Sequence, residues 1–167
     1  VTTYMLIKNG ENNERHLGLS KYIQSGEIKP IKEIPNLPNL IRGDLEDIDY
    51  FKEEVYMVKP SHKQKVFKGK IWMLVSDNVY SSSEYAAMFA KASGFATLVG
   101  TQTGGDGIGV DTAHIVLPES GLVVQYSPIY GLSNDGMGSE EFGTTPDIIS
   151  ENGESPLQTC LSAIANE

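Results

Sequence analysis

Apolar runs alternate with polar and glycine-rich segments along this chain, and the clearest alternation lies between residues 68 and 109. Residues 71–75 form a short continuous apolar run, which is typical of a buried strand. Strong helix formers occupy residues 85–91, and a second apolar run follows at residues 97–100, just before a glycine-rich segment. A strand, a helix and another strand in this order predict one βαβ unit with parallel strands.

Turn signals divide the rest of the chain into shorter elements. Residues 9–15 begin with Asn-Gly and continue with polar residues, which favours a hairpin or turn. Residues 17–23 fit either a strand or a short helix, and the proline-studded residues 25–49 predict an irregular connection over the surface. Ser155 and Pro156 predict the start of a last helix with one apolar face. Further strands are predicted from β-rich runs at residues 1–8, 53–59, 111–117 and 122–126.

Composition and charge limit the classes of protein to which this chain can belong. Its 167 residues are 40% hydrophobic and 21% charged, which suits one globular domain with a real core. The net charge of −9 argues against a nucleic-acid or anionic-membrane partner, because both attract a basic face. No apolar run has transmembrane length, and the single Cys160 excludes an internal disulfide. No cluster of His, Cys, Asp or Glu has metal-ligand spacing, so no metal is expected. The glycine-rich residues 104–109 lack the Gly-Lys-Ser/Thr of a P-loop and a following helix, so no nucleotide cofactor is expected either.

Ser81 is the first candidate for chemistry, because it lies between the first strand of the βαβ unit and its helix. In α/β folds the carboxyl ends of the strands are the usual place for a site. The N–H groups of a first helical turn have no intrahelical partner, so they can stabilise the oxyanion that forms when a serine attacks a carbonyl. The alternative is structural, since Ser81-x-x-Glu84 also fits a capping box.

The stretch around Ser81 resembles the serine peptidases of the C-terminal-processing (tail-specific) and tricorn-core family. IWMLVSDNVYSSSEYAAMF and the following ATLVGTQTGGDG are similar to that family's nucleophile strand, serine-rich turn, helix and Thr-rich glycine loop. EEFGTTPDI, at residues 140–148, resembles the family's closing segment. The resemblance implies an α/β fold, a βαβ superhelix of the crotonase/Clp-protease type with layered sheet and helices. It also implies a serine endopeptidase that hydrolyses peptide bonds through an acyl-enzyme.

The resemblance gives roles to five residues. Ser81 takes the nucleophile position, and the Ser82 N–H takes the position of one oxyanion-hole donor. Asp106 stands where the Ser/Lys members hold their catalytic lysine, so that dyad is absent, and the plainer role of Asp106 is in a turn. In the tricorn-like branch a glutamate acts with a histidine. Glu140 takes the position of this glutamate with Glu141 as the neighbouring alternative, although both also fit a solvated acidic turn.

None of the three histidines matches the family's catalytic histidine, which lies far upstream. His16 and His62 lie in polar segments. His114 lies on a predicted strand after the glycine loop and could approach Ser81, but a lone strand histidine is more often packed or solvated. The chain also begins at Val1, inside a predicted strand. Residues 1–167 are therefore expected to be a single domain, the C-terminal portion of a longer catalytic domain, with the histidine outside this chain.

The resemblance implies a peptide or protein substrate, and it leaves homo-oligomerisation open. It favours an exported or cell-surface location, because relatives in the family are often exported. Two alternatives share the fold: a non-catalytic binding or scaffold domain, which the loss of the lysine allows, and an acyl-CoA enzyme of the crotonase type, which lacks the serine. Fold alone does not choose among these functions.

Overall fold

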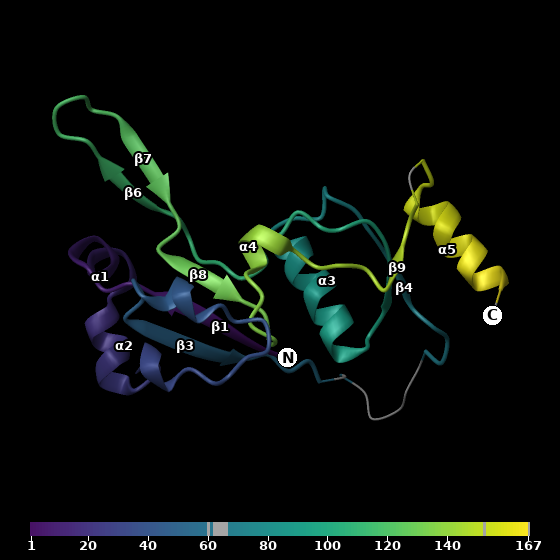
Figure 1. Ribbon diagram of the computed structural model, residues 1–167, viewed down its shortest axis with the longest axis horizontal. Coiled ribbons are helices and arrows are strands. Elements are labelled where there is room, and N and C mark those ends of the chain that lie inside the picture. The colour runs from purple at the N-terminus through teal and green to yellow at the C-terminus, as the bar shows by residue number, and fades with distance from the viewer. Residues whose placement is uncertain (60, 62–66, 152, 167) are drawn as a thin grey trace. The chain divides into compact units, whose positions relative to one another are not determined.

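The computed structural model describes residues 1–59, 61, 67–151 and 153–166 of the chain, which carry both helices and strands (Figure 1). The chain divides into two compact units. Unit one consists of Val1, Val55–Gly107 and Ser139–Glu167, and unit two consists of Thr2–Glu54 and Ile108–Gly138. The described residues form several sheets together with helices, so the mixed α/β class predicted from the sequence is confirmed.

The centre of unit one is a parallel sheet whose described strands have the order β4-β5-β9. β4 (Trp72–Val75) and β9 (Ile148–Ile149) lie on either side of β5 (Thr97–Gly100), and both pair with it in parallel. The helix α3 (Ser82–Ser93) connects β4 to β5, which confirms the predicted βαβ unit. Small and aliphatic side chains fill the core of this unit: Val75, Ala87, Ala90, Ala96 and Leu98.

The last helix, α5 (Pro156–Ala165), begins where the sequence predicts but buries another side. The Ser155 hydroxyl accepts a hydrogen bond from the Gln158 N–H (3.3 Å), and the Gln158 side chain accepts one from the Ser155 N–H (3.0 Å). Thr159 and Cys160 are buried, and α5 contacts β4 and β5. The apolar face expected from the sequence is instead exposed, at Leu157, Leu161 and Ile164.

The centre of unit two is a sheet with the strand order β2-β3-β1-β8 among the described residues. β1 (Thr2–Ile7) confirms the first predicted strand, and it pairs antiparallel with β8 (Ile129–Leu132), which the sequence does not predict. β2 (Ile28–Pro30) pairs antiparallel with β3 (Tyr50–Val55), which begins three residues earlier than the strand predicted there. The core of this unit contains Tyr4, Leu6, Ile34, Leu37, Phe51 and Leu132.

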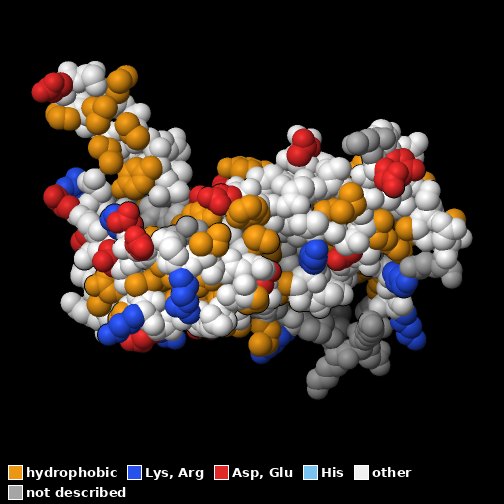
Figure 2. Space-filling model, in the orientation of Figure 1, with side chains coloured by type: hydrophobic (Ala, Val, Ile, Leu, Met, Phe, Trp, Pro, Cys, Tyr) orange, Lys and Arg blue, Asp and Glu red, His pale blue; other side chains and the backbone are white. Residues whose placement is uncertain are grey.

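A separate antiparallel hairpin in unit two consists of β6 (Ala113–Val116) and β7 (Val123–Tyr126). Both strands confirm the prediction, with shorter bounds. Apolar side chains along the hairpin stay exposed, and Figure 2 shows some of them in orange at its upper left. Cross-strand hydrogen bonds therefore define this element more than burial does. Its exposed apolar residues are Val116, Leu117, Leu122, Val123 and Val124.

The hairpin predicted near the start of unit two is wrong. Residues 11–15 lie within the helix α1 (Glu11–Leu17), whose first turn carries two glutamates. Acidic side chains in a first turn favour the helix because its N-terminus carries partial positive charge. Of the two alternatives for residues 17–23, the helix holds for most of the segment, as α2 (Leu19–Ser25). Gly18 separates the two helices, with φ at 62° in the left-handed region that glycine tolerates.

The proline-studded connection contributes to the core, which the sequence does not predict. It contains β2 and the 3₁₀ turns η1 (Ile31–Glu33) and η2 (Arg42–Leu45). Ile34 and Leu37, between prolines, are 5% and 9% exposed and pack in the core of unit two. Prolines keep the backbone extended, but the aliphatic side chains between them still gain from leaving water. The expectation of a mere surface connection is therefore wrong for this part.

Candidate active site

Ser81 lies directly before α3 in a strained backbone conformation. Its φ is 58° and its ψ is −124°, outside the regions that residues with a Cβ normally occupy. Among the described residues, Ser81 and Asp106 are the non-glycine residues with positive φ, and both have φ at 58°. Such conformations persist only where the surroundings fix them, and they cluster at functional sites. A strained strand-to-helix turn is one way in which proteins expose a nucleophilic serine.

Backbone hydrogen bonds place the glycine loop (residues 104–109) between the Ser81 turn and α4 (Ser139–Phe142), the short helix that carries Glu140. The bonds are Ser81 N–H to Gly105 O (3.1 Å), Gly104 N–H to Val79 O (2.8 Å) and Asp106 N–H to Ser139 O (2.9 Å). This order continues the order of β4, β5 and β9 in the sheet. The nucleophile candidate and Glu140 therefore flank the loop that holds Asp106.

Glycine at position 105 allows this close approach. Gly105 has φ at 86°, and a Cβ there would lie 2.5 Å from the carbonyl oxygen of Ser139. Gly107 packs as closely on α3, since a Cβ there would lie 2.9 Å from the backbone nitrogen of Tyr85. A side chain at either position would push the loop away from its neighbours, so this packing depends on the two glycines.

The capping-box alternative for Ser81 and Glu84 is wrong in this structure. The Ser81 side chain makes no capping hydrogen bond at the start of α3. A capping residue normally has an extended backbone, and the positive φ of Ser81 takes its hydroxyl out of that arrangement. Ser83 interacts with the turn instead, since its hydroxyl accepts from the Tyr80 N–H (3.1 Å) and donates to the Tyr80 carbonyl (2.7 Å). Ser81 is exposed, and Glu84 is buried.

The N–H of Ser82 is the first backbone donor after Ser81 along the chain. The N–H of Tyr85 donates to the Ser81 carbonyl (2.9 Å), and the N–H of Ser83 donates to the Tyr80 carbonyl (3.3 Å). No described residue accepts a hydrogen bond from the Ser82 N–H. A first-turn N–H of this kind suits a developing negative charge, which the helix dipole also favours.

Acidic side chains surround the residue before Ser81. The pKa of the Tyr80 phenol is raised from its ordinary value, mainly by a hydrogen bond to the Asp106 side chain and by the negative charge of that carboxylate. Slight burial and the charge of Glu140 act in the same direction. Glu140 is half-buried in α4, whereas Glu141 is exposed. The structure therefore brings Ser81, Asp106 and Glu140 into one part of unit one.

A sequence model of peptidase family S41 matches residues 10–150, which is most of the chain. The chain belongs to peptidase family S41. This membership confirms the coarser part of the resemblance seen in the sequence.

Two solved structures are similar to this S41 chain, and the one with a TM-score above 0.5 shares features of its fold. Mature CPAF complexed with lactacystin has a TM-score of 0.55 and 12% identity, over 99% of this chain and 37% of that one. Mature CPAF has a TM-score of 0.42 and 19% identity, over 58% of this chain and 19% of that one. The S41 chain therefore spans well under half the length of the solved chains that it matches. No curated protein matches it.

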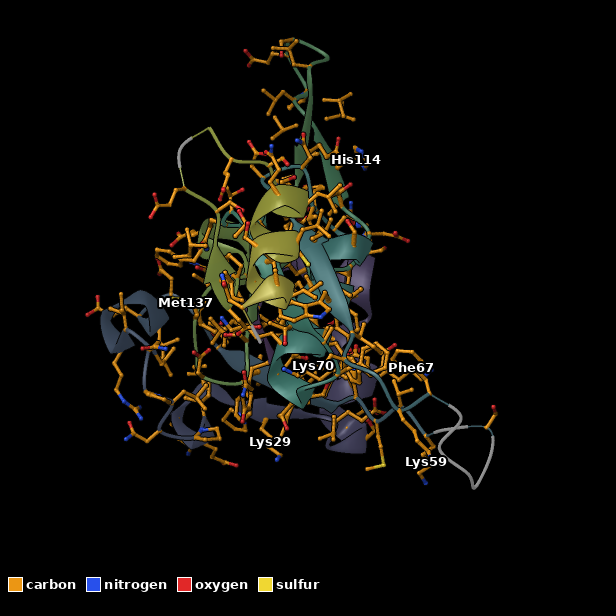
Figure 3. The ribbon with its side chains drawn as sticks, turned by 90° about the vertical axis from the view of Figure 1, so that its right-hand side faces the viewer. Lys29, Lys59, Phe67, Lys70, His114 and Met137 are labelled. Carbon is orange, nitrogen blue, oxygen red and sulfur yellow. The ribbon has the colours of Figure 1, made fainter. Side chains whose placement is uncertain are left out.

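The two described histidines of the S41 chain belong to unit two, whereas Ser81 belongs to unit one. His114 is exposed on β6 of unit two, where Figure 3 labels it. His16, also in unit two, has its Nε2 atom 2.7 Å from the carbonyl oxygen of Asp111. His62 lies outside the described residues. Within the described part of unit one, no histidine accompanies Ser81 and Glu140.

The sequence did not point to Tyr80, or to a series of buried hydrogen bonds that begins at Glu84. These hydrogen bonds link Glu84 to Thr144 and Thr144 to Thr103, and all three residues are buried. The signal was present, since the threonines lie in the two segments that resemble the peptidase family. Their inward direction was not readable, because threonine and glutamate are more often exposed.

Neither a metal centre nor a membrane span is found in the described part of the chain. No group of three or more His, Cys, Asp or Glu side chains there could hold a metal ion. No helix there is long and apolar enough to cross a membrane.

Proposed function

We propose that this S41 chain is the C-terminal part of the catalytic domain of a serine endopeptidase of the tricorn-like branch, with Ser81 as nucleophile. The observation that carries the proposal is the strained Ser81 turn, with its exposed hydroxyl beside the Ser82 N–H. The family membership and the resemblance at residues 68–148 support it. Residues 1–167 then form a single domain, a βαβ superhelix of the crotonase/Clp-protease type.

The proposed reaction begins when the Ser81 Oγ attacks the carbonyl carbon of a peptide bond. A histidine from outside this chain takes the serine proton, and Glu140 orients that histidine and stabilises its charged form. The Ser82 N–H donates to the oxyanion of the tetrahedral intermediate. The C–N bond then breaks, the amine leaves with the proton from the imidazolium, and water hydrolyses the ester on Ser81.

Asp106 does not act as the base in this proposal. A carboxylate cannot replace the neutral amine of a catalytic lysine, and the Asp106 side chain interacts with Tyr80. Its backbone joins the glycine loop to α4 through the Ser139 carbonyl (2.9 Å). Asp106 therefore orders the loop between nucleophile and Glu140, while Glu141, exposed on α4, is the fallback for Glu140. The substrate is a peptide or protein, and an exported location is favoured.

Labelling with a fluorophosphonate probe tests the nucleophile. The full-length protein should be modified at Ser81, and Ser81→Ala should abolish the label. Ser82→Ala is the matched control, because it keeps the backbone N–H and removes only a neighbouring hydroxyl, so labelling should persist. The modified residue is identified by peptide mass spectrometry.

The same experiment separates the enzyme from the non-catalytic alternative. A folded full-length protein that takes no label at Ser81 would contradict the proposal and favour a binding or scaffold domain. The observation that supports this second function is Asp106, which stands where the Ser/Lys members of the family have their catalytic lysine.

A further inference from the structure

Glu84 is a buried carboxyl group in the first turn of the helix that follows Ser81. It is 1% exposed, although a glutamate in this turn usually points to solvent. Burying a carboxyl group costs free energy unless hydrogen bonds compensate it. A buried side chain of this kind, so close to the candidate nucleophile, therefore calls for a specific role.

One oxygen of Glu84 is held by the segment that follows Glu140. The Thr144 hydroxyl donates to Glu84 Oε1 over 2.6 Å, and both groups are buried. The other oxygen, Oε2, is buried and has no hydrogen-bond partner among the described residues. Glu84 also lies in the first turn of α3.

Thr144 extends this contact to the start of the glycine loop. Its N–H donates to the Thr103 hydroxyl over 2.6 Å, and its carbonyl accepts from the Thr103 N–H over 3.2 Å. Thr103 directly precedes the glycines that pack beside Ser81. The chain Glu84–Thr144–Thr103 thus joins three segments from the inside: the nucleophile helix, the closing segment and the glycine loop.

The glycine loop also packs directly on Glu84. A Cβ at Gly107 would lie 2.8 Å from Glu84 Cγ. Glu84 therefore touches two of the segments whose backbones are hydrogen-bonded around Ser81. A change in the position of Glu84 would move the Ser81 turn relative to α4.

We propose that Glu84 is a positioning residue, which sets the Ser81 turn relative to Glu140 through its hydrogen bond with Thr144. The inference rests on the proposed function of Ser81 as nucleophile. Because Glu84 is buried, it touches no substrate, and its effect falls on the rate of attack rather than on binding. A displacement of about 1 Å at a nucleophile can lower a rate by about 100-fold.

The test measures fluorophosphonate labelling of Ser81 in the full-length protein over a range of probe concentrations. Thr144→Val keeps the side-chain shape and removes the donor, so we expect the maximal labelling rate to fall at least about tenfold. The half-saturating concentration should change less than about twofold, because no substrate contact is lost. Thr144→Ser keeps the hydroxyl and should restore most of the rate. Thr145→Val is the matched control, since Thr145 is exposed and its hydroxyl donates to Gln102 (2.8 Å).

Substitutions at Glu84 complete the test. Glu84→Asp keeps the carboxyl group but shortens the side chain, so it should lose rate as Thr144→Val does. Combined with Thr144→Val, Glu84→Asp should lose little more than either single variant, because both break the same hydrogen bond. Circular dichroism confirms the fold of each variant, and Thr144→Ser keeps the test informative if Thr144→Val does not fold.

The outcomes separate this inference from the proposed function. A folded wild-type protein that takes no label at Ser81 would overturn both. A labelled wild type, with folded Thr144→Val and Glu84→Asp variants that react at the wild-type rate, would overturn the positioning role alone. Fully additive losses in the combined variant, or a Thr144→Ser variant as slow as Thr144→Val, would also overturn it.

Discussion

Two strained residues define the site at the scale of single residues. Ser81 and Asp106 both have positive φ, and the backbone N–H of each is held by a carbonyl, of Gly105 and Ser139 respectively. A non-glycine residue in such a conformation costs about 1–3 kcal/mol. The two hydrogen bonds offset part of that cost. Each strained conformation therefore depends on the hydrogen bonds between the Ser81 turn, the glycine loop and α4.

Replacing Asp106 by Asn should lower the pKa of Tyr80 toward its ordinary value of 10.0. Asn tolerates positive φ as Asp does, but it removes the negative charge that opposes ionisation of the phenol. In the wild type the pKa of Tyr80 is raised in the folded state. The interaction of the protonated Tyr80 phenol with Asp106 therefore stabilises the fold below pH 10, and this stabilisation is lost as the pH rises through the raised pKa. Absorbance at alkaline pH follows this titration, with Tyr80→Phe identifying the Tyr80 signal.

Asp111→Asn is the control for this titration, since Asp111 is exposed and belongs to unit two. It should leave the Tyr80 signal where it is. An Asp106→Asn variant whose Tyr80 titrates as in the wild type would contradict the hydrogen bond between the two side chains.

The sequence pointed to Ser81 through its place between a predicted strand and helix, and to Asp106 and Glu140 through the resemblance of their segments to a peptidase family. It did not reveal the direction of Glu84, because the same Ser-x-x-Glu pattern fits a capping box. The choice depends on Thr144, 60 residues away in the chain. Contacts of such long range leave no local signal.

At the scale of elements, the two main helices of unit one begin in different ways. α5 begins with a complete capping box at Ser155, whereas α3 begins after the strained Ser81 without a side-chain cap. Both starts fit the same Ser-x-x-Glu/Gln pattern in the sequence. The difference in backbone conformation separates a stabilising residue from a candidate for chemistry.

Unfolding experiments should show this difference. Ser155→Ala should lower the free energy of unfolding by about 1 kcal/mol, because it removes the hydroxyl that accepts from the Gln158 N–H. Ser81→Ala should change it by less than about 0.5 kcal/mol, since no capping hydrogen bond is lost. Urea unfolding of both variants at pH 7 measures the two values, and equal losses would argue that Ser81 caps α3 after all.

Elements with strong local signals were predictable, and those that depend on distant partners were not. The βαβ unit follows from two apolar runs with a helix between them. β8 was missed because its four residues, interrupted by Gly131, give only a weak local signal, and β8 exists through its pairing with β1. The sequence pattern of α5 shows an apolar face that contains Leu157. The pattern does not show that the side with Cys160 is the one buried in the structure.

At the scale of the whole molecule, the chain forms two compact units from interleaved segments, and each unit has its own core. Leu98, at 0% exposure, lies in the core of unit one, and Phe51, at 1%, lies in that of unit two. Unit two contains two separate stretches of chain with a long segment of unit one between them. The core of unit two therefore needs both of its stretches, whereas the core residues of unit one all lie between Val75 and Leu98. The interleaving of the two units along the chain is the basis for proposing a single domain.

The single-domain proposal predicts one cooperative unfolding transition. Leu98→Ala should lower the free energy of unfolding by about 2–5 kcal/mol and Phe51→Ala by about 3–5 kcal/mol, because each empties a closed core. In one domain, either substitution shifts the same transition for every probe. The fluorescence of Trp72, the single tryptophan, reports on β4 in unit one, and far-ultraviolet circular dichroism reports on both units. If Phe51→Ala shifted the dichroism transition and left the Trp72 transition in place, the two units would unfold separately, and the single-domain proposal would be wrong.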